Sequence, residues 1–136
     1  MSLSVYVDAS AFVAVFFERD QRHEEAKAAL ADLRSSKRRL VTASDVFDET
    51  VTALRRWAGY ERAVMAGEML RTSVLVDIVS LDDDLRETGW RLFRKHRLPG
   101  LSLTDCTSFA TMQLLRVRQA FTFDDDFRKA GFSALP

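Results

Sequence analysis

The sequence is poor in cysteine, in long apolar runs and in net charge. Cys106 is the single cysteine, so no disulfide can form within the chain, which suits a reducing compartment. The longest strongly apolar run covers residues 11–17, whereas a membrane-spanning helix needs about 20 residues. The amino terminus also lacks the charged, apolar and small-residue segments of a signal peptide. We therefore expect a cytoplasmic protein that does not enter a membrane.

The 20 Lys and Arg residues balance the 20 Asp and Glu residues, which leaves no formal net charge. A neutral chain does not attract nucleic acid over long distances, although a local basic group or a bound cation can still hold phosphate. A chain of 136 residues fits one domain and hides enough surface to fold without a disulfide or a structural metal. We expect a single domain over residues 1–136.

Short apolar segments alternate with helical patterns along the chain. The first, residues 5–7, runs directly into Asp8 and a helical pattern, which is typical of a central strand of a parallel sheet. Further strands are expected at 40–41, 74–79, 120–123 and 132–135, and helices at 11–17, 26–33, 45–58, 61–71, 85–93 and 104–115. This alternation predicts an α/β fold, a three-layer α/β/α sandwich around a mainly parallel sheet of four to five strands.

Four acidic residues lie at or near the junctions between these elements. Asp8 and Asp124 directly follow expected strands, Asp105 stands with Thr104 at the start of a helix, and Glu49 lies between two apolar stripes of a helix. Each has an ordinary explanation when taken alone: a helix cap for Asp8 and Asp105, a turn for Asp124, and a solvated side chain for Glu49. Ligands, however, bind in the crevice at the carboxyl ends of parallel strands, so convergence there would make a site.

Converging carboxylates need a way to offset their mutual repulsion. At ~4 Å and an effective dielectric constant near 20, each pair of like charges costs about 4 kcal/mol. Either some of the acids stay protonated or a cation binds between them. A set of oxygen ligands without His or Cys suits the hard ions Mg²⁺ and Mn²⁺. A hydroxyl group lies within two residues of each aspartate, at Ser10, Thr104 and Thr122.

The segments around these acids resemble the motifs of PIN-domain nucleases, and most closely those of VapC-type toxins from toxin–antitoxin pairs. The resemblance rests on VYVDASAF (5–12), DET (48–50), LTDCTSF (103–109) and TFDDDF (122–127), in an order and spacing that cover nearly the whole chain. It implies a PIN-like fold and an endoribonuclease that uses Mg²⁺ or Mn²⁺ to hydrolyse RNA phosphodiester bonds. It also implies a cognate antitoxin of the VapBC type.

The resemblance assigns roles residue by residue. The acidic catalytic and metal-binding positions of the family fall on Asp8, Glu49, Asp105 and Asp124. Asp126 matches an auxiliary metal-binding acid, and the supporting hydroxyls are those of Ser10, Thr104 and Thr122. Asp8 and Asp105 would be the primary ligands. The choice among Asp124, Asp125 and Asp126 for the fourth position stays open, because that position varies within the family.

Basic and aromatic residues on the Glu49 helix and just after it are candidates for contacts with partners. Arg55 and Arg56 can hold RNA phosphates, and Trp57 and Tyr60 can stack on bases or serve a core or dimer contact. The three phenylalanines at 11–17 exceed what one small core can bury. We therefore expect a homodimer, or an antitoxin helix that lies in a groove beside this segment.

Two other functions were weighed against a nuclease. An aspartyl phosphotransfer domain also has an acid after its first strand, but such phosphatases have a second Asp two residues later, where this chain has Ser10. The second alternative is a PIN-fold module that binds RNA or a regulatory partner without cutting it. All four acids are present, so the sequence gives no sign that the catalytic site has been lost. His23 and His96 lie among charged residues away from the acidic motifs, which argues against a metal-free ribonuclease.

Overall fold

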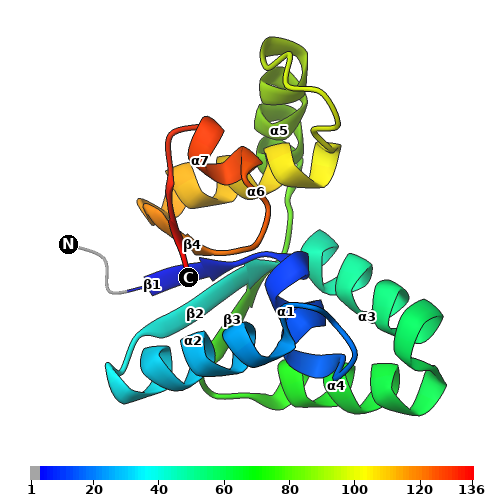
Figure 1. Cartoon of the computed structure of the whole chain (residues 1–136). Coiled ribbons are helices and arrows are strands. Elements are labelled where there is room, and N and C mark those ends of the chain that lie inside the picture. Colours follow the sequence, from blue (N-terminus) through cyan, green and yellow to red (C-terminus); the bar gives the residue numbers. More distant parts are fainter. Residues whose placement is uncertain (1–3) are drawn as a thin grey trace.

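Five parallel strands form the sheet at the centre of the computed structural model, which describes residues 4–136 (Figure 1). The strand order is β3-β2-β1-β4-β5, and all four neighbouring pairs are parallel. The strands are β1 (Ser4–Val7), β2 (Arg39–Ala43), β3 (Val76–Val79), β4 (Gln119–Phe121) and β5 (Ser133–Leu135). The predicted α/β class and its parallel sheet are confirmed.

Helices cover both faces of this sheet. They are α1 (Ala9–Phe16), α2 (His23–Ser35), α3 (Ser44–Ala58), α4 (Tyr60–Thr72), α5 (Asp83–Lys95), α6 (Leu103–Leu115) and α7 (Asp126–Lys129). In Figure 1 the first four lie on one side of the sheet and the last three on the other, which gives the predicted three layers. The short helix α7 was not predicted, because its four residues are too few for a helical period to be seen.

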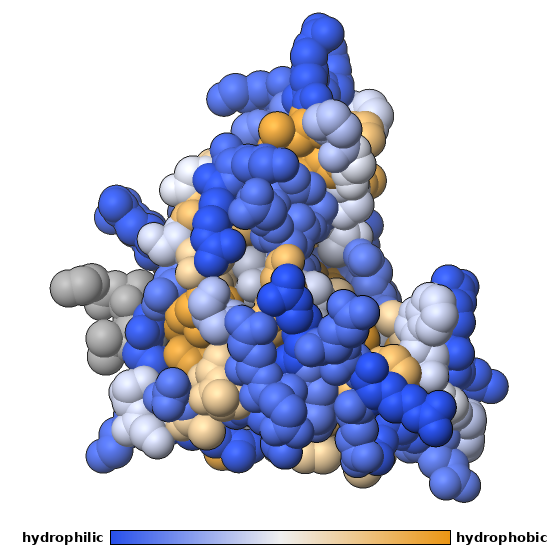
Figure 2. All heavy atoms as spheres, in the orientation of Figure 1, coloured by the Kyte–Doolittle hydropathy of each residue, from blue (hydrophilic) through white to orange (hydrophobic). Residues whose placement is uncertain are grey.

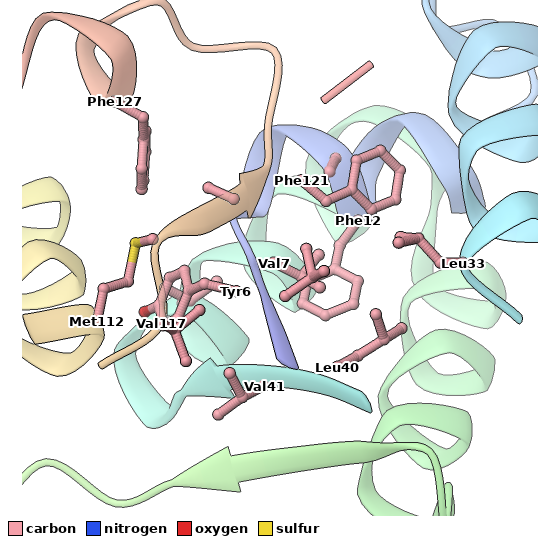
Figure 3. Packing of buried hydrophobic residues seen from close by; sticks show 14 of the residues in the cluster. Tyr6, Val7, Phe12, Leu33, Leu40, Val41, Met112, Val117, Phe121 and Phe127 are labelled. Carbon is pink, nitrogen blue, oxygen red and sulfur yellow. The ribbon is translucent and has the colours of Figure 1, made fainter. Parts of the chain in front are cut away.

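The central position of β1 follows from its sequence. Val5, Tyr6 and Val7 are all almost fully buried, as expected of a strand that has helices on both faces. Successive side chains of β1 point to opposite faces: Figure 3 shows Tyr6 beside Met112 of α6, whereas Val7 faces the side of α1. The Tyr6 hydroxyl donates to Ser108 Oγ of α6 at 2.8 Å, so the buried phenol is satisfied.

Three strands are shorter than predicted: β3, β4 and, by one residue, β5. β3 begins at Val76 and not at residue 74, because β3 is at the edge of the sheet, where Val74 is 83% exposed. β4 ends at Phe121, and the Thr122 N–H still donates to the Leu135 carbonyl of β5 (3.1 Å). The chain then turns at Asp124, whose Oδ1 accepts the Asp126 N–H (2.9 Å).

The surface is mostly polar on the face that Figure 2 shows, with apolar residues visible in small groups. Among the described residues, no helix is both long enough and apolar enough to cross a bilayer.

Helices α5 and α6 approach each other closely at Gly89. A Cβ atom built on Gly89 would lie 2.5 Å from Thr107 Cγ2 and 3.0 Å from the Thr107 Cα. Gly67 of α4 is the other glycine inside a helix, and there the nearest atom to a built Cβ is Val51 Cγ1 at 3.3 Å. The two sites differ because the obstacle at Gly89 includes backbone, whereas the obstacle at Gly67 is a side chain that can move.

We expect Gly89→Ala to lower the free energy of unfolding by about 1–3 kcal/mol, since overpacking forces α5 away from α6. Gly67→Ala is the matched control: it gains helix propensity of up to about 1 kcal/mol and meets a milder contact. Urea unfolding of both variants measures the difference. If Gly89→Ala were as stable as Gly67→Ala, the close α5–α6 contact would be wrong.

Candidate active site

Acidic residues come together at the carboxyl ends of β1, β2 and β4. Asp8 follows β1 directly, and its backbone N–H donates to the Phe121 carbonyl at the end of β4 (3.1 Å). Helix α3, which carries Glu49, begins directly after β2. Nearby, the carboxylates of Asp105, Asp124 and Asp126 have oxygen atoms that all lie within 4.8 Å of one another. Segments from both halves of the chain thus form one acidic cluster.

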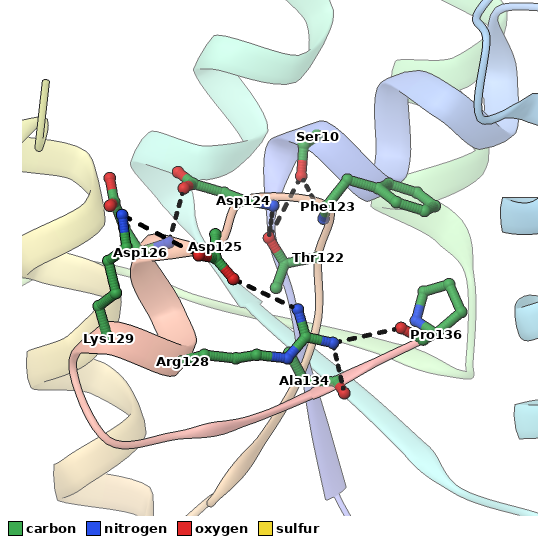
Figure 4. A network of polar contacts seen from close by, with 10 residues as sticks. All are labelled: Ser10, Thr122, Phe123, Asp124, Asp125, Asp126, Arg128, Lys129, Ala134 and Pro136. Carbon is green, nitrogen blue, oxygen red and sulfur yellow. Dashed lines mark hydrogen bonds and ion pairs between the residues drawn. The ribbon is translucent and has the colours of Figure 1, made fainter.

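Two hydroxyl groups hold the Asp8 carboxylate. Asp8 Oδ2 accepts hydrogen bonds from Ser10 Oγ (2.8 Å) and from Thr122 Oγ1 (2.9 Å). Each hydroxyl oxygen in turn accepts a backbone N–H, Ser10 from Phe123 (3.0 Å) and Thr122 from Asp124 (2.9 Å), as Figure 4 shows. Because a hydroxyl carries one hydrogen, both hydrogens then point at Asp8. Asp8 makes no side-chain cap bond to α1, so helix capping does not account for it.

The three consecutive aspartates in the loop after β4 do not all point the same way. Asp124 Oδ1 accepts the Asp126 N–H at 2.9 Å, an Asx turn that folds the loop back on itself. Asp125 is exposed and pairs with Arg128 (3.7 Å) and Lys129 (4.0 Å) on its far side (Figure 4). Asp124 and Asp126 thus lie beside Asp105, whereas Asp125 is paired with cations.

Asp105 belongs to the start of α6. The predicted cap at Thr104 or Asp105 is wrong: Ser102 is the N-cap, and its Oγ accepts the Asp105 N–H (3.0 Å). Asp105 Oδ2 accepts the Ser102 N–H in return (3.1 Å), which completes a capping box. This reciprocal pair fixes the Asp105 side chain, which is 8% exposed. One carboxylate thus serves the helix start and the cluster together.

Glu49 lies at the open rim of the cluster. It is exposed on α3. Desolvation raises the pKa of Glu49, the Thr104 side chain lowers it, and the charges of Asp8 and Asp45 raise it further. Glu49 is therefore under the influence of the same acidic cluster.

Asp45 also borders the cluster, although its sequence position suggested only a helix cap. The Thr107 hydroxyl of α6 donates to Asp45 Oδ2 at 2.5 Å, so the first turn of α3 is tied to α6. Its position four residues before Glu49 was the available signal, because residues at that spacing share one face of a helix. Asp45 was not predicted to lie near the cluster, because a helix cap already explained an acid at that position.

The electrostatic state of the cluster shows that it is short of positive charge. Burial, first, and then the charges of Asp8 and Asp124 raise the pKa of Asp105 to about 7. The pKa of Asp8 is also raised, mainly by burial and against the two hydroxyl donors, and that of Asp126 is raised by desolvation and by Asp124. Within residues 4–136, no Lys or Arg forms an ion pair with Asp8, Asp105 or Asp124.

The donor set fits a hard divalent cation. Every side chain that meets in the cluster offers oxygen, from carboxylates or hydroxyls, and none offers nitrogen or sulfur. Mg²⁺ and Mn²⁺ prefer such ligands. A bound divalent ion would also relieve the repulsion that now raises several carboxyl pKa values. The residues present therefore suit such an ion on both chemical and electrostatic grounds.

Arg55 and Arg56 do not lie at the cluster. They are on the last turn of α3, which places them about 9–10 Å along the helix axis from Glu49 at a rise of 1.5 Å per residue. The Arg55 guanidinium stacks over the Tyr60 ring, 4.9 Å from its centroid. Any contact they make with RNA would therefore be away from the scissile bond.

A family model described as the PIN domain matches residues 5–133. The chain belongs to the PIN-domain family. Two curated relatives of this PIN domain, from two strains of Mycobacterium tuberculosis, are both described as the 23S rRNA-specific endonuclease VapC20. Each is 35% identical to it over 128 residues, which are 94% of this chain and 95% of the relative.

Solved structures agree with this membership. The crystal structure of M. tuberculosis VapC20, described as a sarcin–ricin loop cleaving toxin, matches the PIN domain with a TM-score of 0.87 and 35% identity, over 95% of this chain and 96% of that one. A toxin–antitoxin complex from Klebsiella pneumoniae matches with a TM-score of 0.68 over 98% and 97% of the two chains. Its identity is 20%, so it supports the fold alone.

The raised carboxyl pKa values predict how stability depends on pH. Asp105 has a pKa of about 7 in the folded protein and an ordinary value of 3.8, so the folded state binds more protons between about pH 4 and pH 7. Stability of the metal-free protein should then fall as pH rises through this window, by roughly 1–4 kcal/mol. Thermal unfolding in EDTA at pH 5.5 and pH 8 measures this as a drop of several degrees in Tm.

Asp105→Asn is the control, because removing the charge should flatten the change in Tm between the two pH values. Mg²⁺ should raise the Tm of the wild type more at pH 8, where it need not displace protons, than at pH 5.5. A metal-free protein that is more stable at pH 8 than at pH 5.5 would contradict the crowding of these carboxylates.

Proposed function

We propose that this PIN domain is a metal-dependent endoribonuclease that hydrolyses RNA phosphodiester bonds and acts as the toxin of a VapBC-type toxin–antitoxin pair. The observation that carries the proposal is the crowding of Asp105, Asp124 and Asp126 beside the buried Asp8. Among the described residues 4–136, no Lys or Arg forms an ion pair with Asp8, Asp105 or Asp124. Membership of the PIN-domain family and the likeness to the VapC20 endonuclease support it. We also propose that residues 1–136 act as a single PIN domain and function in the cytoplasm.

The residues proposed to hold Mg²⁺ or Mn²⁺ are Asp8, Glu49, Asp105, Asp124 and Asp126. When bound, the ion would lower the pKa of a water molecule and offset the charge that develops on the phosphate. Ser10 and Thr122 orient the Asp8 carboxylate through their two hydrogen bonds. Thr104 is proposed to support Glu49, whose pKa its side chain lowers. Oriented carboxylates lower the reorganisation needed when substrate binds.

Proton transfer falls to the chain's own carboxylates. Glu49 is the exposed acid of the cluster, so it is placed to accept a proton from an attacking water and to release it to solvent. Attack by water, and not by the ribose 2′-hydroxyl, would leave a 5′-phosphate and a 3′-hydroxyl. Labelling of the cleaved ends before and after phosphatase treatment distinguishes these products from a cyclic phosphate.

We expect Asp8→Asn and Asp105→Asn each to reduce Mg²⁺-dependent RNA cleavage by about a hundredfold or more, since each removes a ligand charge worth several kcal/mol to the transition state. Asp125→Asn is the matched control, an acid of the same loop that is held by Arg128 and Lys129. Initial rates on a single-stranded RNA, at saturating Mg²⁺, give the comparison.

Asp105→Asn should not destabilise the protein at pH 8 in EDTA, because it removes repulsion from the cluster. If this variant is folded but inactive, its loss of cleavage is due to the missing carboxylate and not to unfolding. Undiminished cleavage by both variants would refute the assignment of the site. Metal uptake and RNA binding without cleavage by the wild type would instead favour the non-cleaving module.

The substrate is proposed to be ribosomal RNA, since the relatives are described as specific for 23S rRNA and as cleaving the sarcin–ricin loop. We expect the PIN domain to cut 23S rRNA at few positions and to leave 16S rRNA largely intact. Primer extension on both RNAs after brief incubation with Mg²⁺ measures the cut positions. Equal fragmentation of the two RNAs would overturn the proposed substrate but would leave the nuclease activity standing.

An antitoxin partner and a homodimer remain part of the proposal. The likeness to the structure of VapC20, which is described as a toxin, supports the first. The exposed apolar residues of α4, which include Val64, Met65 and Met69, offer area for either contact. Light scattering of the isolated chain, and again with the product of the adjacent gene, separates the two.

A further inference from the structure

A polar pocket lies where α1 ends and α3 turns into α4. It has a volume of about 370 Å³, and its walls include Phe17, Glu18, Arg19, Trp57 and Arg62. The turn between α3 and α4 is made by Gly59, with φ of 97°, a backbone conformation that favours glycine. This pocket is separate from the acidic cluster, and none of the residues assigned to that cluster lines it.

Trp57 is exposed in a way that the fold does not require. The buried stripe of α3 runs through Val46, Thr50 and Leu54, and the next turn carries Trp57, whose exposed fraction is 65%. A rigid helix thus presents a large aromatic face to solvent at the mouth of a polar pocket. Such a side chain can stack on any nucleobase, because stacking uses the face of the ring.

The charges at the pocket suit an anionic ligand. Arg19 and Arg62 provide two guanidinium groups, and Glu18 is the one acid in the pocket wall. Glu18 pairs with Arg62 at 3.3 Å, but both side chains are exposed (72% and 38%), so a phosphate can exchange with this weak pair. Arg55 and Arg56 lie on the same turn of α3 as Trp57. Two further acids lie next to the pocket arginines in sequence: Asp20, which accepts the Arg22 N–H, and Glu61 on the first turn of α4.

Helices α1 and α3 connect this pocket to the acidic cluster. α1 begins directly after Asp8 and ends at the pocket, and α3 carries both Glu49 and Trp57. Eight residues separate Glu49 from Trp57, about 12 Å along the helix. The two helices pack together, since Val13 and Phe16 of α1 contact the buried cluster that contains Leu54. A few nucleotides of extended RNA span such a distance.

We propose that this pocket is a nucleotide-binding subsite for the single-stranded part of the RNA substrate, in which Trp57 stacks on a base and Arg19 and Arg62 hold the neighbouring phosphate. The proposal rests on the proposed function, since it takes RNA as the substrate. It adds an anchoring point a few nucleotides from the scissile bond. The polar walls favour RNA over a second copy of the chain, because a two-fold contact here would bring the arginines of both copies together.

The chain offers a direct fluorescence test, because Trp57 and Trp90 are its only tryptophans. In Trp90→Phe, Trp57 is the only indole, and in Trp57→Phe only Trp90 remains. Each variant is titrated with a single-stranded RNA of about ten nucleotides, within the range of site sizes seen for single-strand binders. Ca²⁺ replaces Mg²⁺, and Asp105→Asn is added to both to prevent cleavage. We expect saturable quenching in the first variant and none in the second.

Kinetics provide an independent readout. Trp57→Ala should raise KM for RNA about tenfold and leave kcat nearly unchanged, since stacking is worth roughly 1–3 kcal/mol per base. Trp57→Phe should recover part of the loss, because a smaller ring still stacks. Trp90→Ala, which removes an exposed indole from α5 (46% exposed), is the matched control and should leave KM unchanged. Arg19→Gln with Arg62→Gln should weaken the salt dependence of binding.

The outcomes are distinguishable. RNA binding, measured by anisotropy of a labelled RNA, with unchanged Trp57 fluorescence would overturn the subsite and leave the proposed function intact. So would an unchanged KM in Trp57→Ala together with a lost dimer or lost antitoxin binding, which would make the pocket a protein interface. Quenching of Trp57 by RNA in a wild-type protein that never cleaves with Mg²⁺ would instead refute the nuclease and retain the subsite.

Discussion

Repulsion between carboxylates is the physical constraint on which the rest of the active site depends. The fold brings Asp8, Asp105, Asp124 and Asp126 to one edge of a parallel sheet, and burial raises the energy of their charged forms. The described part of the chain supplies hydroxyls and backbone N–H groups to some of these acids, but no ion pair to Asp8, Asp105 or Asp124. The site is therefore held in a state that a divalent ion would relieve, and metal affinity is the expected use of this stored electrostatic energy.

The parallel sheet explains why a few features of the sequence were enough to locate this edge of the sheet. In such a sheet every strand ends on the same side, so an acid that directly follows a buried strand is placed at the site by topology alone. Asp8 and Asp124 follow β1 and β4, which are neighbours in the sheet, although 116 positions separate the two residues. The spacing of apolar residues was sufficient to predict the strands and most helices, and the position of Asp8 and Asp124 after strands was sufficient to single out these two acids.

Other parts of the site depend on local geometry that the sequence does not encode in an obvious pattern. Neither period nor composition distinguishes Asp124 from Asp125, and only the turn of the loop directs one inward and the other toward Arg128. Ser102 was missed as the cap of α6 because the residues after it also suit a helix start. Asp45 was obscured in the same way, since a helix cap was a sufficient explanation of an acid at that position.

The hydroxyl network has a consequence for when the site comes into existence. Ser10 lies near the first strand and Thr122 directly follows β4, and Asp8 needs both to be held as described. During synthesis the ribosome releases these two segments at the beginning and at the end of translation. A nascent chain that stops before β4 has neither Thr122 nor Asp124, so its acidic cluster is incomplete. The complete acidic site therefore comes into existence only after the last strands have been translated.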